Sequence, residues 1–210
     1  MKKKAILIVL SVLMGASLLV GCGSKDNKTT SNTEQTEQKQ ENKQNTQKEE
    51  YKSGFYEVGK DLPAGEYVII SDKSNKQAET SIEVTKDSKK EDEIFDESVS
   101  GNIYVTLSKG EYIEVKNGDI FPIDKAPSTT PKDKVYKDGM FKVGRDIKAG
   151  TYEVKSIEKD KNDDAAIEIT KDSTHRDKSV ISKKEFKKST KVTLKDGEYI
   201  KLDDAEIVVK

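Results

Sequence analysis

Apolar and polar residues alternate over short stretches throughout the last 160 residues of the chain, which is the pattern of half-buried β-strands. No window of twelve residues carries the apolar stripe of an amphipathic helix. The sequence therefore predicts an all-β fold. The alternating segments are 82–84, 103–107, 113–115, 167–169, 192–194 and 200–202.

The alternating region consists of two copies of one sequence repeat. Residues 54–67 (GFYEVGKDLPAGEY) and 139–152 (GMFKVGRDIKAGTY) are identical at seven of fourteen positions. Three matching blocks in the same order indicate a tandem duplication. The other two matches are 82–88 with 167–173, at the same offset of 85, and 105–115 with 192–202, at an offset of 87.

Two copies are too few for a solenoid, so we expect two small antiparallel β-sandwich domains of jelly-roll-like form. About seven strands are expected in each. Their boundaries are set at 51–124 and 135–210, with a stiff Pro-rich linker at 125–134. Each core is thin for a domain of about 75 residues. The sequence leaves open whether the two copies also pack on each other.

Two kinds of turn recur in the copies. The dipeptides at 109–110 and 196–197 (Lys-Gly and Asp-Gly) predict two-residue hairpin loops, in which Gly supplies the positive φ. Asp61 and Asp146 each follow Val-Gly-Lys or Val-Gly-Arg. We expect their carboxylates to accept backbone N–H bonds within the turn, with ligand contacts as the alternative. Tyr67 and Tyr152 follow these turns and are expected to pack in the core or at its rim.

The N-terminus predicts export and lipidation. A lysine-rich start and an apolar run over 5–20 are typical of a signal peptide, which we assign to 1–21. Residues 19–22 (Leu-Val-Gly-Cys) resemble a bacterial lipobox, which implies that Cys22 becomes a diacylglyceryl-Cys. Residues 22–50 then form a disordered polar tether. We expect an extracytoplasmic protein anchored to the outer face of the cell membrane, the alternative being an uncleaved membrane anchor.

The VGxDIxAGxY-like segment found in both copies resembles a segment of secreted proteins and lipoproteins of clostridia and related Gram-positive bacteria. The resemblance covers nearly all of residues 54–210. It implies a Gram-positive lineage, and it carries no established activity, ligand or catalytic residue.

Catalytic and metal chemistry find little support. A single Cys forms neither a disulfide nor a Cys-ligated metal site, and a net charge of -1 gives no general attraction to nucleic acid. His175, the one histidine, is expected in a solvated loop. An EF-hand calcium loop starting at residue 160 would need Gly at its sixth position and Glu at its twelfth, but Ala165 and Lys171 stand there, so a polar hairpin loop is expected over 160–164. No cofactor and no enzymatic activity are predicted.

Charge separates the two copies. Residues 51–127 carry 10 basic and 16 acidic side chains, whereas residues 128–210 carry 20 and 17. The basic excess includes Lys183, Lys184, Lys187 and Lys188. These lysines are either ordinary solvated surface or a patch that meets the other copy, another envelope protein, anionic lipid or anionic cell-wall polymer.

The sequence thus favours a lipid-anchored surface protein that displays two non-catalytic binding or interaction modules. A structural or accessory envelope component without a small ligand is the alternative. A carboxylate-dependent hydrolase is the third hypothesis.

Overall fold

The computed structural model describes residues 49–72, 74, 79–157 and 164–209, all of them in one compact unit. The predicted signal peptide, Cys22, nearly all of the tether and residues 158–163 lie outside the described residues. Among the described residues, none belongs to a helix long and apolar enough to cross a membrane.

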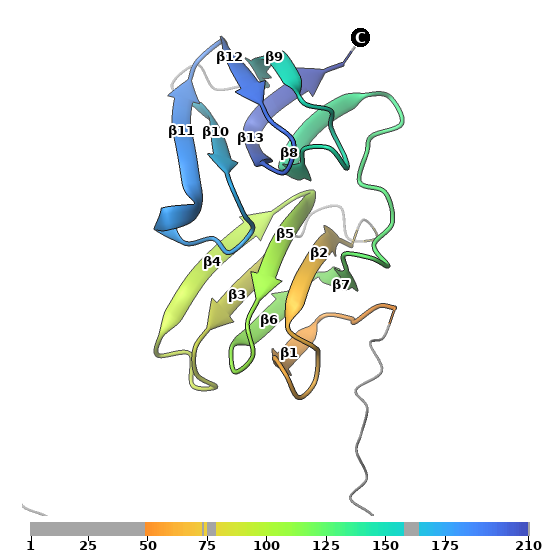
Figure 1. Cartoon of the computed structure of the whole chain (residues 1–210), viewed down its shortest axis with the longest axis vertical. Coiled ribbons are helices and arrows are strands. Elements are labelled where there is room, and N and C mark those ends of the chain that lie inside the picture. Colours follow the sequence, from red (N-terminus) through yellow and green to blue (C-terminus); the bar gives the residue numbers. More distant parts are fainter. Residues whose placement is uncertain (1–48, 73, 75–78, 158–163, 210) are drawn as a thin grey trace, which may run out of the picture. The chain divides into compact units, whose positions relative to one another are not determined.

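The predicted all-β fold is confirmed, with thirteen strands in antiparallel sheets and one short 3₁₀ helix, η1 (Asp177–Ser179), in the described part (Figure 1). The first copy contains β1 (Gly54–Glu57), β2 (Gly65–Ser71), β3 (Thr80–Thr85), β4 (Glu93–Val99), β5 (Asn102–Leu107), β6 (Tyr112–Lys116) and β7 (Gly118–Pro122). The second contains β8 (Val135–Lys142), β9 (Gly150–Ser156), β10 (Ala165–Thr170), β11 (Val180–Phe186), β12 (Ser189–Leu194) and β13 (Tyr199–Val208).

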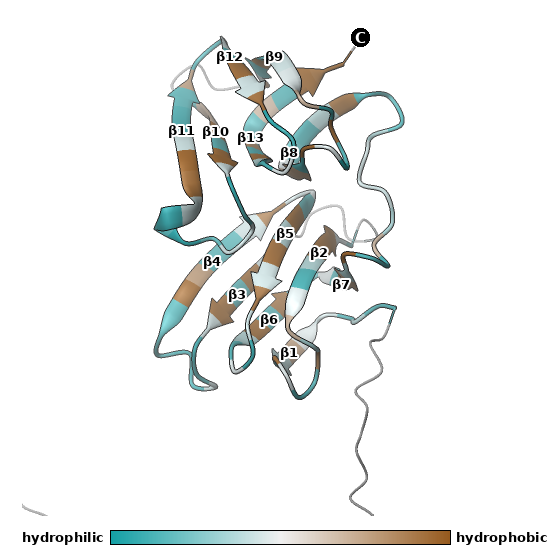
Figure 2. Ribbon diagram, in the orientation of Figure 1, coloured by the Kyte–Doolittle hydropathy of each residue, from teal (hydrophilic) through white to brown (hydrophobic). Residues whose placement is uncertain are grey.

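The first copy, called repeat 1 (51–124), is a sandwich of two sheets. A four-stranded sheet has the order β1-β6-β3-β4, and a three-stranded sheet has the order β5-β2-β7. Alternate residues of both sheets face inward and are buried, for example Ile82 and Val84 of β3 and Ile103 and Val105 of β5. Figure 2 shows the resulting alternation of apolar and polar positions along the strands.

The second copy, called repeat 2 (135–210), has the same pairing. Strands β8, β13, β10 and β11 form the equivalent of the four-stranded sheet, and β12, β9 and the end of β13 form the equivalent of the three-stranded one. Strand β13 serves both sheets because it runs on where repeat 1 breaks into β6 and β7. A residue of positive φ nevertheless occupies the equivalent position in both repeats, Asn117 (58°) in repeat 1 and Asp204 (50°) in repeat 2.

Strand register gives a residue-by-residue correspondence between the repeats. Ile82 lies opposite Glu97 and Ile167 lies opposite Lys184, so Lys184 corresponds to Glu97. By the same comparison of paired strands, Lys201 corresponds to Glu114 and Thr193 corresponds to Thr106. Each position of one repeat can therefore be compared directly with its equivalent in the other.

The hairpin prediction for the two Gly-containing dipeptides is wrong, although their positive φ is found. Gly110 has φ 90° and Gly197 has φ 87°. However, β5 pairs with β2 while β6 pairs with β1 and β3, so the turn at Lys109-Gly110 carries the chain from one sheet to the other. Only the second central residue has a positive φ, which is the geometry of a type II turn rather than a type I′ hairpin.

Candidate functional site

The two repeats pack on each other, and their interface contains buried polar side chains such as Asn102, Asp146 and Ser173. Repeat 1 contributes the outer face of its three-stranded sheet, here called the receiving face. Val68 and Tyr104 on this face are both 0% exposed. Met140 and Tyr199 of repeat 2 belong to the same core cluster as these two residues. The receiving face comprises Glu66, Val68, Ile70, Asn102, Tyr104 and Thr106.

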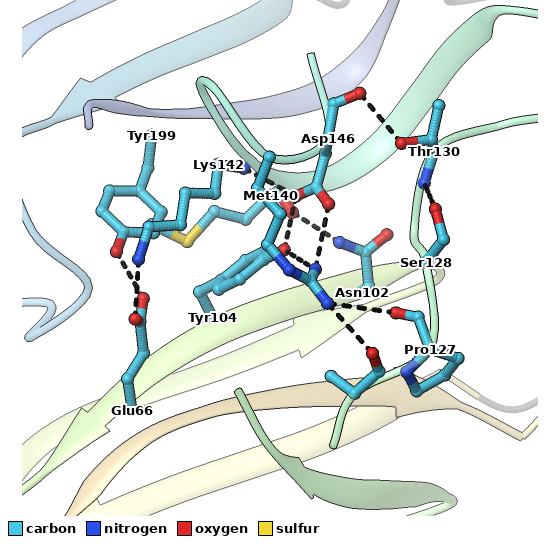
Figure 3. A network of polar contacts seen from close by, with 12 residues as sticks. Glu66, Asn102, Tyr104, Pro127, Ser128, Thr130, Met140, Lys142, Asp146 and Tyr199 are labelled. Atoms are coloured by element: carbon cyan, nitrogen blue, oxygen red, sulfur yellow. Dashed lines mark hydrogen bonds and ion pairs between the residues drawn. The ribbon is translucent and has the colours of Figure 1, made fainter. Parts of the chain in front are cut away.

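Glu66 joins repeat 1 to three side chains of repeat 2, and Figure 3 shows two of them, Lys142 and Tyr199. Its carboxylate accepts hydrogen bonds from Lys142 Nζ at 2.7 Å, from Ser173 Oγ at 3.3 Å and from the Tyr199 hydroxyl. Burial opposes the charge of Lys142, but the bonds to Glu66 and Tyr199 outweigh burial and raise the pKa of Lys142. Lys142 therefore stays charged at neutral pH.

Asp146 and Asp61 occupy equivalent turns but different surroundings. The Asp61 carboxylate accepts the Glu57 N–H at 2.8 Å, and the Asp146 carboxylate accepts the Lys142 N–H at 2.8 Å. Asp61 is exposed, whereas Asp146 is 5% exposed and also accepts the hydroxyl hydrogen of Tyr104 across the interface. Burial and this bond to Asp146 raise the pKa of Tyr104, so the phenol remains a donor.

The linker between the repeats is part of the same network. Arg145 contacts Asp146 at 3.0 Å and the Tyr104 hydroxyl, and its Nη2 donates to the carbonyls of Ala126 at 3.1 Å and Pro127 at 3.3 Å (Figure 3). Thr130 Oγ1 donates to the Asp146 carbonyl at 3.0 Å. The linker is therefore bound to the turn that repeat 2 inserts against repeat 1.

A loop of repeat 2, residues 172–176, fills a groove at the edge of repeat 1. The Thr106 N–H donates to the Ser173 carbonyl at 2.7 Å, so the loop continues the hydrogen-bonding edge of β5. The ring of His175 stacks on Phe95 with centroids 4.2 Å apart. Arg176 Nη2 pairs with Glu111 at 2.7 Å. We call this feature the loop groove.

The expectation that His175 lies in a solvated loop is wrong. Its Nε2 donates to the Tyr104 carbonyl at 2.7 Å, and its backbone adopts a φ of 52°. Comparison of the two copies gave no hint of this role, because the equivalent residue of repeat 1 is Lys90. Lys90 has a similar φ of 64° but lies at the surface of repeat 1. Burial lowers the pKa of His175, against smaller opposing effects of the Tyr104 carbonyl and of Glu97.

The lowered pKa of His175 predicts that acid weakens the fold. Below about pH 6.5 the unfolded chain binds a proton at His175 while the folded chain remains neutral, so stability falls with pH until the folded-state pKa is reached. Urea unfolding between pH 8 and pH 5 should show this loss. His175→Asn keeps a residue that tolerates positive φ and should remove the loss attributable to His175. An unchanged pH dependence in that variant would contradict the assignment.

Repeat 2 carries the equivalent groove, and in repeat 2 it is open. It has a volume of about 380 Å³. Its floor is apolar, from Ile167, Ile169 and Val192. The position of Tyr104 is taken by exposed Lys191, and Thr193 is exposed where Thr106 is half-buried. The remaining lining residues are Ile181, Ser182, Lys183, Lys184, Thr193, Lys195 and Glu198.

Two of the four lysines predicted as a patch line this groove. Lys183 and Lys184 line it, and the Lys184 ammonium donates to Thr190 Oγ1. Lys187 and Lys188 do not line it and lie in the exposed turn between β11 and β12. The ion pairs of Lys183 with Glu168 (4.0 Å) and of Lys187 with Asp164 (3.9 Å) are long, so these ammonium groups are only weakly neutralised.

The remaining candidates have local roles. The Tyr67 and Tyr152 hydroxyls donate to the carbonyls four residues earlier, at 2.6 Å and 2.7 Å, and Tyr67 is 1% exposed. Of residues 160–164, only Asp164 is described. No group of three or more His, Cys, Asp or Glu side chains suited to a metal ion occurs among the described residues.

The residues that make the interface, Glu66 and Tyr104 foremost, were not singled out from the sequence. One signal was present. Some equivalent positions of the two copies carry side chains of different polarity, as Tyr104 and Lys191 do. Such a difference indicates that the face is covered in one copy and open in the other. No known protein family matches this chain, and no curated protein matches it either.

Proposed function

We propose that this protein is a lipid-anchored, non-catalytic interaction protein of the bacterial surface, in which the loop groove of repeat 2 binds an acidic polypeptide segment. The lipobox-like sequence ending at Cys22 supports the anchor, and the polar tether supports display outside the membrane. The two sandwiches provide the rigid scaffold on which the groove is built.

The observation that carries the proposal is that the same groove is filled in repeat 1 and open in repeat 2. In repeat 1 the occupant is a polypeptide loop that bonds to the strand edge through Thr106. Thr193 lies opposite Thr151 in the register that places Thr106 opposite Glu66, so its N–H points outward from the edge of β12. A free edge beside an apolar floor is suited to the addition of an extended peptide.

Charge defines the occupant further. Four lysines (183, 184, 191 and 195) line the groove against a single acid, Glu198. An occupant with carboxylates is therefore favoured over one with basic side chains. The same lysines support a second candidate, an anionic cell-wall polymer, which would use the charges but not the strand edge. The structural or accessory role remains a third proposal, in which the groove has no small ligand.

We expect full-length protein in detergent micelles to bind fluorescent poly-L-glutamate. Replacement of Lys183, Lys184, Lys191 and Lys195 by Gln should weaken binding by roughly tenfold or more, because four exposed charge contacts of up to about 1 kcal/mol each are lost. Fluorescence anisotropy would measure the change. Binding should also fall steeply between 0.1 M and 1 M salt, where the Debye length shortens from about 10 Å to about 3 Å.

The matched control replaces four exposed lysines of repeat 1 by Gln, which makes the same change in net charge. These are Lys52, Lys60, Lys86 and Lys116. Binding should be nearly unchanged in this control. Poly(glycerol phosphate), which has no peptide backbone, separates the candidates: tighter binding of this polymer than of polyglutamate would favour the wall-polymer alternative. Equal losses in the two quadruple variants would contradict a role for the groove.

A further inference from the structure

Glu198 is the single acidic side chain among the described residues that line the open groove of repeat 2. Its counterpart in repeat 1 is Glu111, which follows the turn between β5 and β6. The backbones of the two glutamates are anchored alike, since the Glu111 carbonyl accepts the Val58 N–H and the Glu198 carbonyl accepts the Val143 N–H, each at 2.8 Å. The filled groove of repeat 1 therefore shows what the open groove lacks at this position.

The two carboxylates are also held in the same way by their turns. Glu111 donates its N–H to the Ser108 carbonyl at 3.1 Å, and its Oε2 accepts the Ser108 N–H at 2.7 Å. Glu198 makes the same two bonds with Lys195, at 3.1 Å and 2.9 Å. Because one carboxylate oxygen is fixed against the backbone, the other oxygen, Oε1, is left to accept from elsewhere.

In repeat 1 that second oxygen binds a cation from the occupying loop. Arg176 Nη2 donates to Glu111 Oε1 at 2.7 Å, and Glu111 is only 8% exposed. Glu198 is half-buried, and within the residues that the structure describes it forms no ion pair and its Oε1 has no partner. The open groove thus retains the acceptor but not the cation.

We infer that Glu198 binds an arginine side chain of the peptide that occupies this groove. The inference rests on the proposed function and refines the occupant to an acidic peptide with one arginine at a set position. Repeat 1 gives that position, because Arg176 lies three residues after Ser173, whose carbonyl accepts the Thr106 N–H. In repeat 2 the arginine therefore follows, by three residues, the peptide residue that bonds to Thr193.

The lysines of the groove limit this pairing and define the rest of the peptide. Lys195 takes the place of Ser108 next to Glu198, so its ammonium group repels an arginine and competes for the carboxylate. Lys195 is nevertheless exposed and forms no ion pair with Glu198 in the described part of the chain. The other three lysines of the groove (183, 184 and 191) attract carboxylates. Charges of both signs in a fixed order confer specificity.

Two synthetic peptides test the inference with full-length protein in detergent micelles. One is acetyl-EEEESGGREEEE-amide, in which the arginine follows the serine by three residues, and the other has glutamine in place of the arginine. The arginine peptide should bind roughly threefold more tightly, because it adds an ion pair with Glu198. Attraction to the lysines alone predicts the opposite order, since the arginine peptide carries one negative charge fewer. Fluorescence anisotropy would measure both dissociation constants.

Three variants assign the preference to its residue. Glu198→Gln should abolish the preference and keep the turn, because the amide oxygen of Gln still accepts the Lys195 N–H. The matched control is Glu185→Gln, the same change of charge at an exposed position of β11 that does not line the groove, and it should keep the preference. Lys195→Ser, which introduces the residue of repeat 1, should increase the preference about twofold by removing the competing ammonium group.

Equal or weaker binding of the arginine peptide by the wild-type protein would overturn the inference. A preference that survives Glu198→Gln, or that falls in Lys195→Ser, would overturn it as well. If polyglutamate still binds through the lysines in these cases, the proposed function of the groove stands and only the arginine is wrong. If neither peptide nor polyglutamate binds, both proposals are wrong.

Discussion

Asp146→Ala should lower the free energy of unfolding by about 3–5 kcal/mol, since it leaves buried polar groups of both repeats without their acceptor. The lost bonds come from the Lys142 N–H, the Tyr104 hydroxyl and the Arg145 guanidinium. Arg145 is then a partly buried cation with no carboxylate beside it. Urea denaturation of the full-length protein in detergent would measure the loss.

Asp61→Ala is the internal control for this substitution, because the same turn in repeat 1 faces solvent. It removes the bond from the Glu57 N–H and should cost about 1 kcal/mol or less. The difference between the two variants isolates the part of Asp146 that serves the interface. Equal costs would show that the aspartate stabilises only its own turn.

Gly101→Ala should separate the two repeats, although the backbone of Gly101 is not in the left-handed region. A Cβ at this position would lie 2.2 Å from the Asp138 carbonyl oxygen of repeat 2, and a backbone atom has little freedom to move away. We expect a loss of about 1–3 kcal/mol, typical of overpacking, together with faster hydrogen exchange at the Thr106 N–H, which is bonded to Ser173.

The equivalent position of repeat 2 provides the comparison. It is Lys188, exposed in the turn between β11 and β12, and Lys188→Ala should change the free energy of unfolding by less than about 0.5 kcal/mol. Protection of the Thr106 N–H should also be unchanged. Normal protection in Gly101→Ala would mean that the repeats can shift without losing the loop contact.

Alternation and repetition sufficed to predict the all-β fold, because both depend on which residues within a repeat are buried against one another. They could not predict the interface between repeats. Glu66 and Lys142 are 76 residues apart, and nothing in the local sequence distinguishes a lysine that pairs across an interface from a solvated one. The role of His175 was missed for the same reason, since its polar neighbours belong to a loop that is covered by another repeat.

The hairpin error has a different cause. A Gly in a short turn fixes the sign of φ but not the strands that the turn connects. The sandwich places β5 and β6 in opposite sheets, so the register information expected from a hairpin was never present at Gly110. Comparison of the two copies position by position would have been more informative. Gly101 and Lys188 are equivalent positions, and the difference between them already indicates one crowded turn and one open turn.

Two of the residues that bind Glu66 follow it by more than a hundred positions in the sequence, and this determines the order in which the interface can form. Tyr199 follows Glu66 by 133 residues, and Ser173 follows it by 107. Synthesis proceeds from the N-terminus, so Val68 and Tyr104 stand uncovered until the last strand begins to emerge. Contacts between residues so far apart in sequence form slowly, and an apolar sheet face that is exposed in the meantime can make incorrect contacts. The nascent chain therefore depends on its final strand to cover a surface that forms in its first half. A chain truncated before that strand would leave this apolar surface exposed and prone to aggregation.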